Sequence, residues 1–131
     1  MIYLVVFILL GCSGQPENKK EAVQTSDSAV ADSSSPITFI ELGSVNCIPC
    51  KMMQPVMAAI GKKYAEQIKI IFYDVWKDDQ RHYAVQYGIR LIPTQVFLDS
   101  EGREIMRHEG FFPEVEIDKF LRSRGLIPRT K

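Results

Sequence analysis

The sequence predicts an α/β domain in which flanking helices cover a mixed four-stranded sheet, in the order β-α-β-α-β-β-α. Three observations support this fold class. Two apolar, strand-like runs are each followed by a helix-like run, as in βα units. A turn cluster then separates two further strand-like runs, which indicates a hairpin. A last helix-like run follows the hairpin and ends at a glycine. The strand that opens the hairpin is expected to run antiparallel to the first strand.

The first half of this domain should contain a strand, a helix and a second strand. Residues 37–42 are apolar on both faces, which is typical of a central strand covered by helices. Residues 48–65 are predicted as a helix, because apolar side chains fall on one face at a spacing of 3.6 residues. These side chains are Met53, Val56, Met57, Ile60 and Tyr64. Pro49 falls in the first turn, where its missing N–H does no harm, and Pro55 falls inside the helix, where a kink is expected. Residues 68–75 are predicted as a second buried strand.

The second half should contain a short helix, the hairpin and a final helix. Residues 78–87 are predicted as the short helix, with Gly88 placed to end it. The hairpin strands are expected at 95–98 and 103–109, on either side of the turn residues 99–102. The final helix is predicted over 113–124, with Gly125 after its end. Its inward side chains are expected to be Val115 or Ile117, together with Phe120 and Leu121.

The N-terminal 11 residues are predicted as a signal peptide. Residues 2–10 are continuously apolar and would span about 14 Å as a helix, roughly half of a bilayer core. The run ends at Leu9-Leu10-Gly11-Cys12, which resembles the lipobox of bacterial lipoproteins. That resemblance implies that Cys12 becomes the first residue, carries acyl chains and anchors the protein to a membrane. The expected location is the bacterial cell envelope, facing the periplasm or the exterior. An uncleaved anchor, or a third redox thiol at Cys12, are the alternatives.

Composition divides the remainder of the chain. Residues 12–36 combine the lipidated cysteine with a linker that is rich in Ser, Asp, Glu, Lys, Gln and Ala, and we expect this linker to be a flexible tether. Residues 37–126 form the predicted domain, and 127–131 a short tail. The 131 residues allow one domain, and a net charge of zero gives no reason to expect nucleic acid as a partner. We expect a monomer without a cofactor or bound metal.

Two cysteines sit at the predicted turn from the first strand into the first helix. Cys47 and Cys50 are separated by Ile48 and Pro49. Free amides and the macrodipole at a helix N-terminus favour a thiolate, so a cysteine there tends to a lowered pKa and to high reactivity. The spacing, next to a βα unit, indicates a redox pair. A zinc site, which would need ligands such as His82 or His108, and a structural staple are the alternatives.

Glu41 interrupts the apolar pattern of the first strand. A buried carboxylate is costly unless it is paired or protonated. Six residues before Cys47, at the end of the strand, its side chain is placed to lie beneath the cysteine pair. We expect it to accept a proton from the second thiol; the alternative is a glutamate turned to solvent.

Several motifs together resemble the thioredoxin superfamily, over residues 37–126. The matching features are the C-x-x-C pair, the lysine after it, a proline five residues past the second cysteine, a Gly-Ile-x-x-x-Pro-Thr segment, and an acid six residues before the first cysteine. In this chain they are Cys47, Cys50, Lys51, Pro55, Gly88, Ile89, Pro93, Thr94 and Glu41. Asn46 stands where the family has Trp, and Ile48-Pro49 where it has Gly-Pro. The N-terminal strand and helix of full thioredoxins are expected to be absent.

This resemblance implies roles for the site residues. Cys47 would be the exposed nucleophile and Cys50 the buried resolving thiol, and the two would form the redox disulfide. Glu41 would be the proton shuttle, and Pro93 would follow a cis peptide bond and pack against the disulfide. Substrate would contact the residues around the pair and the backbone before the proline. These are Asn46, Ile48, Pro49 and Ile92.

The resemblance also implies a function. Pro49 and the buried acid are similar to those of reducing members, so we expect a membrane-anchored thiol-disulfide oxidoreductase that reduces disulfides of exported proteins. Apocytochrome c is one such substrate class, and envelope thiol homeostasis is the broader role. Electrons would come from an integral-membrane carrier. The alternatives are a disulfide-forming oxidase or isomerase, and a binding module whose cysteine pair is idle.

Overall fold

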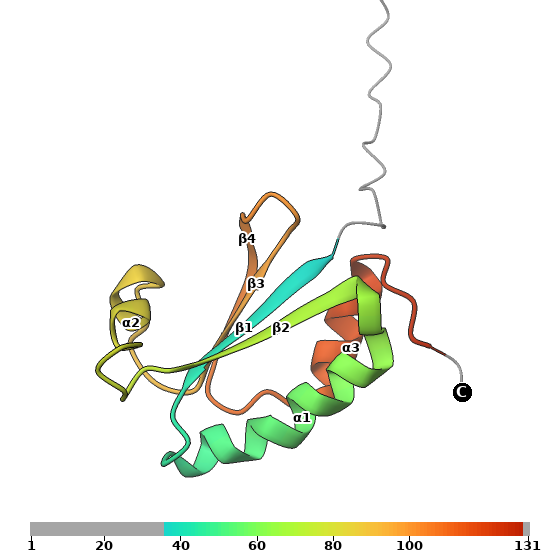
Figure 1. Cartoon of the computed structure of the whole chain (residues 1–131). Coiled ribbons are helices and arrows are strands. Elements are labelled where there is room, and N and C mark those ends of the chain that lie inside the picture. Colours follow the sequence, from blue (N-terminus) through green and yellow to red (C-terminus); the bar gives the residue numbers. More distant parts are fainter. Residues whose placement is uncertain (1–35, 130–131) are drawn as a thin grey trace, which may run out of the picture.

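The structure, a computed structural model, describes residues 36–129 (Figure 1). The predicted signal peptide, Cys12, and all but the last residue of the predicted linker lie outside the described residues. So does the region in which a further N-terminal strand and helix would lie. None of the described helices is long and apolar enough to span a membrane.

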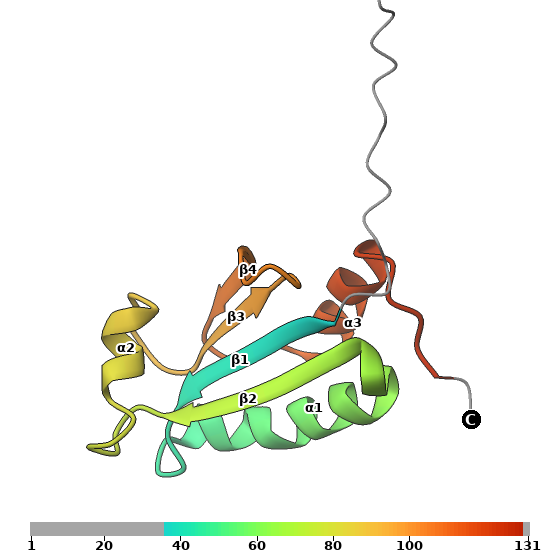
Figure 2. The same ribbon diagram turned by 45° about the horizontal axis from the view of Figure 1, so that its top comes forward.

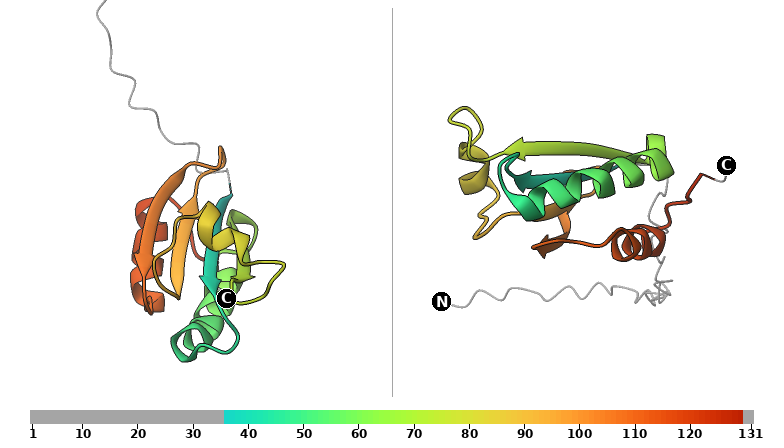
Figure 3. Two further views of the ribbon diagram at one scale, coloured as in Figure 1. Left: turned by 90° about the vertical axis from the view of Figure 1, so that its left-hand side faces the viewer. Right: turned by 90° about the horizontal axis from the view of Figure 1, so that it is seen from below.

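Four strands form one mixed sheet, in the order β2-β1-β3-β4, which confirms the predicted fold class. The chain runs β1 (Ile37–Gly43), α1 (Ile48–Tyr64), the 3-10 turn η1 (Ala65–Gln67), β2 (Ile68–Asp74), α2 (His82–Gln86), β3 (Thr94–Leu98), β4 (Glu104–Glu109) and α3 (Glu114–Ser123). β1 pairs with β2 in parallel and with β3 antiparallel, and β3 pairs with β4 antiparallel. The left view of Figure 3 shows the four strands side by side in this order.

The alternation of side chains along β1 builds two cores, one on each face of the sheet. Phe39 faces α1 and α3, where its ring stacks on that of Phe97 from β3 at 4.4 Å. Ile40 and Leu42 face the opposite side, where they pack with Val96 and the side chains of α2. Both faces of β1 are therefore buried, as its continuous apolar sequence predicted. Figure 2 shows α1 below the sheet and α2 at the end where β1 and β2 finish.

The second helix is shorter than predicted. Helical structure begins at His82 rather than at residue 78. The amides of Gln80 and Arg81 both donate to the carbonyl of Lys77, and the Gln80 side chain accepts a hydrogen bond from the Asp74 amide at 2.7 Å. These bonds hold the segment after β2 in successive turns, so only the last part of the predicted range becomes helix.

The structure decides which residue near the start of the last helix faces inward, a choice that the sequence left open between Val115 and Ile117. Val115 is 68% exposed, and Ile117 instead takes the inward position at 0% exposure. The described part of the predicted tail is bound to the body of the domain. The Ile127 backbone makes two hydrogen bonds to the Gln67 side chain, at 2.7 and 2.9 Å, and the Arg129 amide donates to the Lys63 carbonyl.

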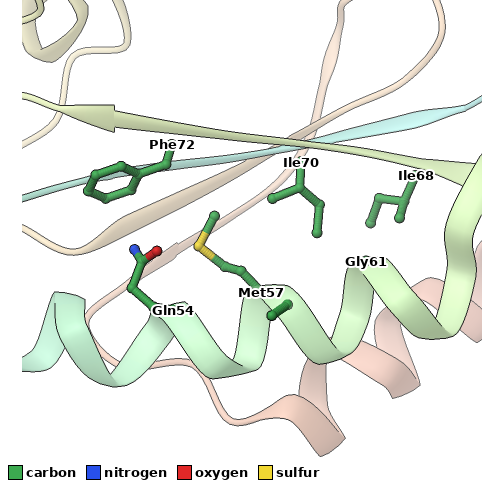
Figure 4. Close-up of a pocket in the computed structure, with 7 residues that line it drawn as sticks. Gln54, Met57, Gly61, Ile68, Ile70 and Phe72 are labelled. Atoms are coloured by element: carbon green, nitrogen blue, oxygen red, sulfur yellow. The ribbon is translucent and has the colours of Figure 1, made fainter.

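A groove of about 460 Å³ opens between α1 and β2, which lies at the edge of the sheet (Figure 4). Apolar side chains from both elements line it, with one amide at the end nearer the start of α1. The lining residues are Gln54, Met57, Ala58, Gly61, Ile68, Ile70 and Phe72. Small residues on this face of α1 keep the groove open, since Gly61 and Ala58 leave little side chain to fill it.

Candidate active site

The two cysteines lie where β1 ends and α1 begins (Figure 2). Cys47 is the N-cap of α1, with extended backbone angles of φ −93° and ψ 126°. Its carbonyl accepts the Lys51 amide at 3.0 Å, which closes the first helical turn. Pro49 occupies that turn, as predicted, and the turn contains no acidic side chain. Both sulfurs therefore lie in the field of the positive end of the helix macrodipole.

The two cysteines differ less in exposure than the family resemblance implied. Cys50 is 0% exposed, but Cys47, expected to be the exposed member, is only 8% exposed. The surrounding turn instead presents apolar side chains to solvent, with Val45 at 50% and Ile48 at 74% exposure. Val45 and Ile48 lie within two residues of Cys47, so a substrate that approaches the Cys47 sulfur would meet exposed apolar side chains beside it. Both thiols are free, so the structure represents the reduced form of the pair.

Asp74, at the end of β2, holds the turn that carries Cys47. Its side chain is 4% exposed and accepts hydrogen bonds from the amides of Val45, at 3.4 Å, and Trp76, at 3.2 Å. The Ser44 hydroxyl accepts the Asn46 amide at 3.2 Å, and the Cys47 amide donates to the Ser44 carbonyl. The loop that follows β2 and the turn that follows β1 are thus tied together by one carboxylate.

The segment before β3 lies at the same end of the sheet. Thr94 pairs with Leu42, one residue before the end of β1, so the segment just before Thr94 lies beside the turn that carries the cysteines. The Ile92–Pro93 peptide bond is cis, as the resemblance implied, and Pro93 is buried. The Thr94 hydroxyl donates to the Leu91 carbonyl at 2.7 Å, which holds the segment in place.

Glu41 is fully buried, which excludes the alternative of a glutamate turned to solvent. Neither of its carboxyl oxygens has a hydrogen-bond partner in the structure. Burial raises the pKa of this carboxyl from its ordinary value of 4.5 to about 8. Gly43 separates it from the second cysteine. A methyl group on residue 43 would lie 3.2 Å from Oε1 of Glu41 and 3.1 Å from the Cys50 sulfur. The acid and the thiol are therefore neighbours across a glycine.

Cys50 is held as a protonated thiol. Burial is the main cause that raises its pKa to about 12, and the hydrogen bond with Cys47 and the charges of Cys47 and Glu41 act in the same direction. A hydrogen bond from the Ser44 backbone opposes the shift. A thiol of this kind needs a nearby proton acceptor before it can attack a disulfide. Glu41 is the carboxyl adjacent to it.

Metal binding has no support in the part of the chain that the structure describes. Within residues 36–129, no three His, Cys, Asp or Glu side chains are grouped so as to hold a metal ion. The zinc alternative considered for Cys47 and Cys50 therefore finds no ligand set there, since His108 contacts the Phe111 carbonyl and the Phe112 ring, and His82 stacks on Tyr83.

Comparison with known proteins agrees with this geometry. Residues 20–125 match the family of the thioredoxin-like domain. The chain belongs to this family. It is similar to thioredoxin of Haemophilus influenzae, at 30% identity over 95 residues, with 72% of this chain and 85% of the relative covered. It is also similar to thioredoxin 1 of Synechococcus elongatus, at 36% identity over 92 residues, with 70% and 82% covered.

The structural comparison gives the same result. Crystalline thioredoxin NaTrxh from Nicotiana alata superposes with a TM-score of 0.59 at 28% identity, covering 68% of this chain and 73% of that chain. With the Cys47–Cys50 pair at the start of α1, membership of the thioredoxin-like family makes this protein a thiol-disulfide oxidoreductase. The family match begins within the predicted linker, 16 residues before the described part of the chain.

Two polar residues at this site are not predicted from the sequence. Asp74 ends a buried strand and was included in that strand without a role, although an acid directly after an apolar run was a signal that the turn there needs an acceptor. The sequence predicts Gln95 only as the first residue of a hairpin strand, but Gln95 is 0% exposed and lies directly opposite Glu41 in the β1–β3 register. Nothing local to Gln95 marks it, because the contact depends on strand register.

Proposed function

We propose that this protein is a lipid-anchored thiol-disulfide reductase of the bacterial cell envelope, which reduces disulfides of exported proteins through the Cys47–Cys50 couple. Apocytochrome c belongs to this substrate class, and an integral-membrane carrier would return electrons to the pair. The observation that carries the proposal is the arrangement of three groups: a thiol at a helix N-cap, a second thiol held protonated behind it, and a buried acid of raised pKa next to the second thiol.

In the first step, the Cys47 thiolate attacks one sulfur of a substrate disulfide. A bond forms between Cys47 and that sulfur, the substrate disulfide breaks, and the other substrate sulfur leaves as a thiolate. The amides at the start of α1 stabilise the anion on Cys47 before the attack. An extended substrate segment would lie against Asn46, Ile48 and Pro49 and pair with the backbone of Ile92, beside Pro93.

In the second step, Cys50 transfers its proton to Glu41 in the ionised form of that acid, and Cys50 attacks the Cys47 sulfur. The Cys47–Cys50 disulfide forms, the mixed disulfide breaks, and the substrate leaves as a second thiolate, which takes a proton from solvent. Substrate gains two electrons and the pair loses two. Because the Glu41 carboxyl has a pKa of about 8, it changes protonation near neutral pH, as a general base for this step must.

The trapping experiment tests the catalytic part of the proposal. Cys50→Ser removes the attacking thiol of the second step, so mixed disulfides through Cys47 should accumulate with exported proteins and should disappear on addition of dithiothreitol. Cys47→Ser, alone and combined with Cys50→Ser, is the matched control and should trap nothing. If the Cys50→Ser protein traps no partner, or traps equally well without Cys47, the pair is idle and the protein is a binding module.

The equilibrium with glutathione tests the direction of transfer. A reductase should have a potential below about −200 mV, whereas an oxidase would lie nearer −120 mV, and about 30 mV corresponds to a tenfold change in this two-electron equilibrium. A value near that of oxidases would overturn the reductase assignment in favour of disulfide formation or isomerisation.

The anchor is tested separately. Labelled palmitate should be incorporated into the full chain, and Cys12→Ala should abolish both the label and the retention of the protein in the membrane fraction. The variant should keep its activity in solution, because 24 residues lie between Cys12 and the domain. Retention of the label in Cys12→Ala would refute lipidation at that residue.

A further inference from the structure

A row of polar side chains crosses the sheet beneath the cysteines. In the register, Glu41 of β1 lies opposite Gln95 of β3, and Gln95 lies opposite His108 of β4. Residues in register on neighbouring antiparallel strands project from the same face, with Cβ atoms about 5 Å apart. The preceding pair on this face makes direct contact, since Phe39 and Phe97 are also in register and their rings stack at 4.4 Å. Glu41 and Gln95 therefore emerge side by side on the face that α1 covers.

Both members of this pair are buried without hydrogen-bond partners. Glu41 and Gln95 are each 0% exposed, and among the described residues the buried side-chain nitrogen and oxygen atoms without a partner are the two oxygens of Glu41 and the oxygen and nitrogen of Gln95. Leaving such a group unpaired in the interior destabilises the folded protein. Their hydrogen-bonding capacities match, because a primary amide can donate to one carboxyl oxygen and accept from the other when the acid is protonated.

The other groups around Glu41 offer it no such partner. On the β2 side, its register neighbour is Phe72, and the next residue on that face, Asp74, uses its oxygens to accept backbone amides. From α1, Cys50 approaches across Gly43, with Cys47 beyond it. From β4, His108 lies on the far side of Gln95, with Nε2 3.2 Å from the Phe111 carbonyl and its ring stacked on Phe112.

We propose that Gln95 is a positioning residue for the proton-accepting carboxyl, and that its amide binds Glu41 and holds it toward Cys50 during the second step. This inference rests on the proposed role of Glu41. The two side chains are not hydrogen-bonded to each other in the reduced structure, and Gln95 Nε2 donates to the Glu41 carboxylate once the acid has lost its proton. Charge-assisted hydrogen bonds are about twice as strong as neutral ones, so the amide favours the ionised acid that must accept the proton.

The test follows the titration of Glu41 itself, in the reduced full-length protein, by the NMR signal of its carboxyl carbon. Gln95→Met keeps the shape of the side chain and removes its hydrogen bonds. We expect it to raise the titration midpoint of Glu41 by about one pH unit, and to shift the pH profile of mixed-disulfide release in the same direction. Val96→Ala is the matched control, because it weakens the same strand from the opposite face, and it should leave the midpoint unchanged. A midpoint in Gln95→Met equal to that of the native protein would overturn the proposal.

A second measurement needs no variant, in case Gln95→Met does not fold. The two side-chain amide protons of Gln95 should shift in the native protein with the same midpoint as the Glu41 carboxyl. If they do not respond to that titration, the pair is not bonded and the inference is wrong. Neither measurement requires turnover, so a coupled titration in a protein that reduces no disulfide would refute the proposed function and leave the pairing intact.

Discussion

Helix α1 has a carboxyl group beside each of its ends, and the two are in opposite states. Asp118 of α3 lies at the C-terminal end, where it accepts hydrogen bonds from the Tyr64 hydroxyl at 2.6 Å, Lys63 at 2.8 Å and Arg122 at 2.8 Å. These partners, Lys63 first and Tyr64 next, hold the pKa of Asp118 well below its ordinary value. Glu41, at the N-terminal end, has no partner, and burial holds its pKa well above the ordinary value.

This difference separates a part of the molecule that stabilises the fold from a part that the chemistry requires. The C-terminal end of α1 joins two helices and the chain terminus through satisfied polar groups, and nothing there can exchange a proton near neutral pH. The N-terminal end leaves an acid and an amide unpaired next to two thiols. An arrangement that costs stability in a small domain is expected where function depends on it.

The largest expected effect comes from removing the unpaired acid. Glu41→Leu should raise the free energy of unfolding, because an apolar side chain replaces an unpaired carboxyl whose ionisation is costly when it is buried. The pKa of Glu41 in the folded protein is raised above its ordinary value of 4.5. The contribution of Glu41 to the free energy of unfolding is therefore fully present below pH 4.5 and is lost as the pH rises to about 8. The difference between variant and native protein should therefore grow across that window, by on the order of 4 kcal/mol.

Urea unfolding of the reduced proteins at several pH values measures this difference. Glu41→Gln is the control, because it keeps the polar burial and removes the titration. A difference between Glu41→Leu and the native protein that stays constant from pH 4.5 to 8 would show that Glu41 is not held neutral. Both variants should slow the release of mixed disulfides, so the more stable protein should be the poorer catalyst.

At the C-terminal end of α1, removing the carboxyl should lower the free energy of unfolding instead of raising it. Asp118→Ala should lower the free energy of unfolding by about 2 kcal/mol near neutral pH, since it leaves the hydroxyl of the buried Tyr64 without its short hydrogen bond. The pKa of Asp118 in the folded protein is lowered from its ordinary value of 3.8. Asp118 therefore stabilises the folded protein above pH 3.8, and this stabilisation is lost as the pH falls through the folded-state pKa. The effect of the substitution should therefore shrink in acid.

Thiol-disulfide exchange should be unchanged in Asp118→Ala at temperatures where the protein is folded, because this end of α1 is remote from the cysteines in sequence and in the fold. Lys119→Ala, on the same helix and exposed, serves as the matched control and should change stability little. A loss of exchange activity in folded Asp118→Ala would show that the C-terminal end of α1 also affects the chemistry of the cysteines.

Local patterns were sufficient for the fold and for part of the site. The hydrophobic periodicity of α1, the apolar run of β1 and the turn residues of the hairpin gave the element order and the mixed sheet, and the position of Cys47 followed from a strand meeting a helix. Each of these signals lies within a few consecutive residues. The short helix was predicted too long because tertiary hydrogen bonds, from Asp74 to Gln80 in particular, hold the preceding segment in turns.

The features of the site that the sequence did not predict are those that depend on strand register and on the fold of a loop. Gln95 becomes the neighbour of Glu41 only once β1 and β3 are aligned, and one residue of slippage would place it on the opposite face. The low exposure of Cys47 is likewise a property of the folded chain. Sequence spacing fixes which residues are near in the chain but not how deeply a loop covers them.

Two glycines, one near each end of α1, lie where an added methyl group would test how closely that end is packed. Gly43→Ala should lower the free energy of unfolding by about 1 kcal/mol. The new methyl would lie 3.1 Å from the Cys50 sulfur, 3.2 Å from the Cys50 Cβ and 3.2 Å from Glu41 Oε1, and the Cys50 Cβ is fixed by the helix. The start of α1 must therefore shift, which should also slow the attack of Cys50 on Cys47. Stability and the rate of mixed-disulfide release measure the two effects, and an unchanged release rate would show that the spacing between acid and thiol is not critical.

Gly61→Ala should have the smallest effect and the opposite sign. The added methyl would lie 3.0 Å from the Cδ1 atom of Ile70, which is the far end of a flexible side chain next to the open groove between α1 and β2 (Figure 4). Ile70 can move into that groove, whereas alanine in a helix interior is favoured over glycine by up to about 1 kcal/mol. We expect a net gain of about 0.5 kcal/mol, measured by urea unfolding, with no change in exchange rate. A loss of stability would mean that the side chains of β2 are packed against α1 as rigidly as the groups around Cys50. The two ends of the helix would then differ in their chemistry but not in how well they accept an added methyl group.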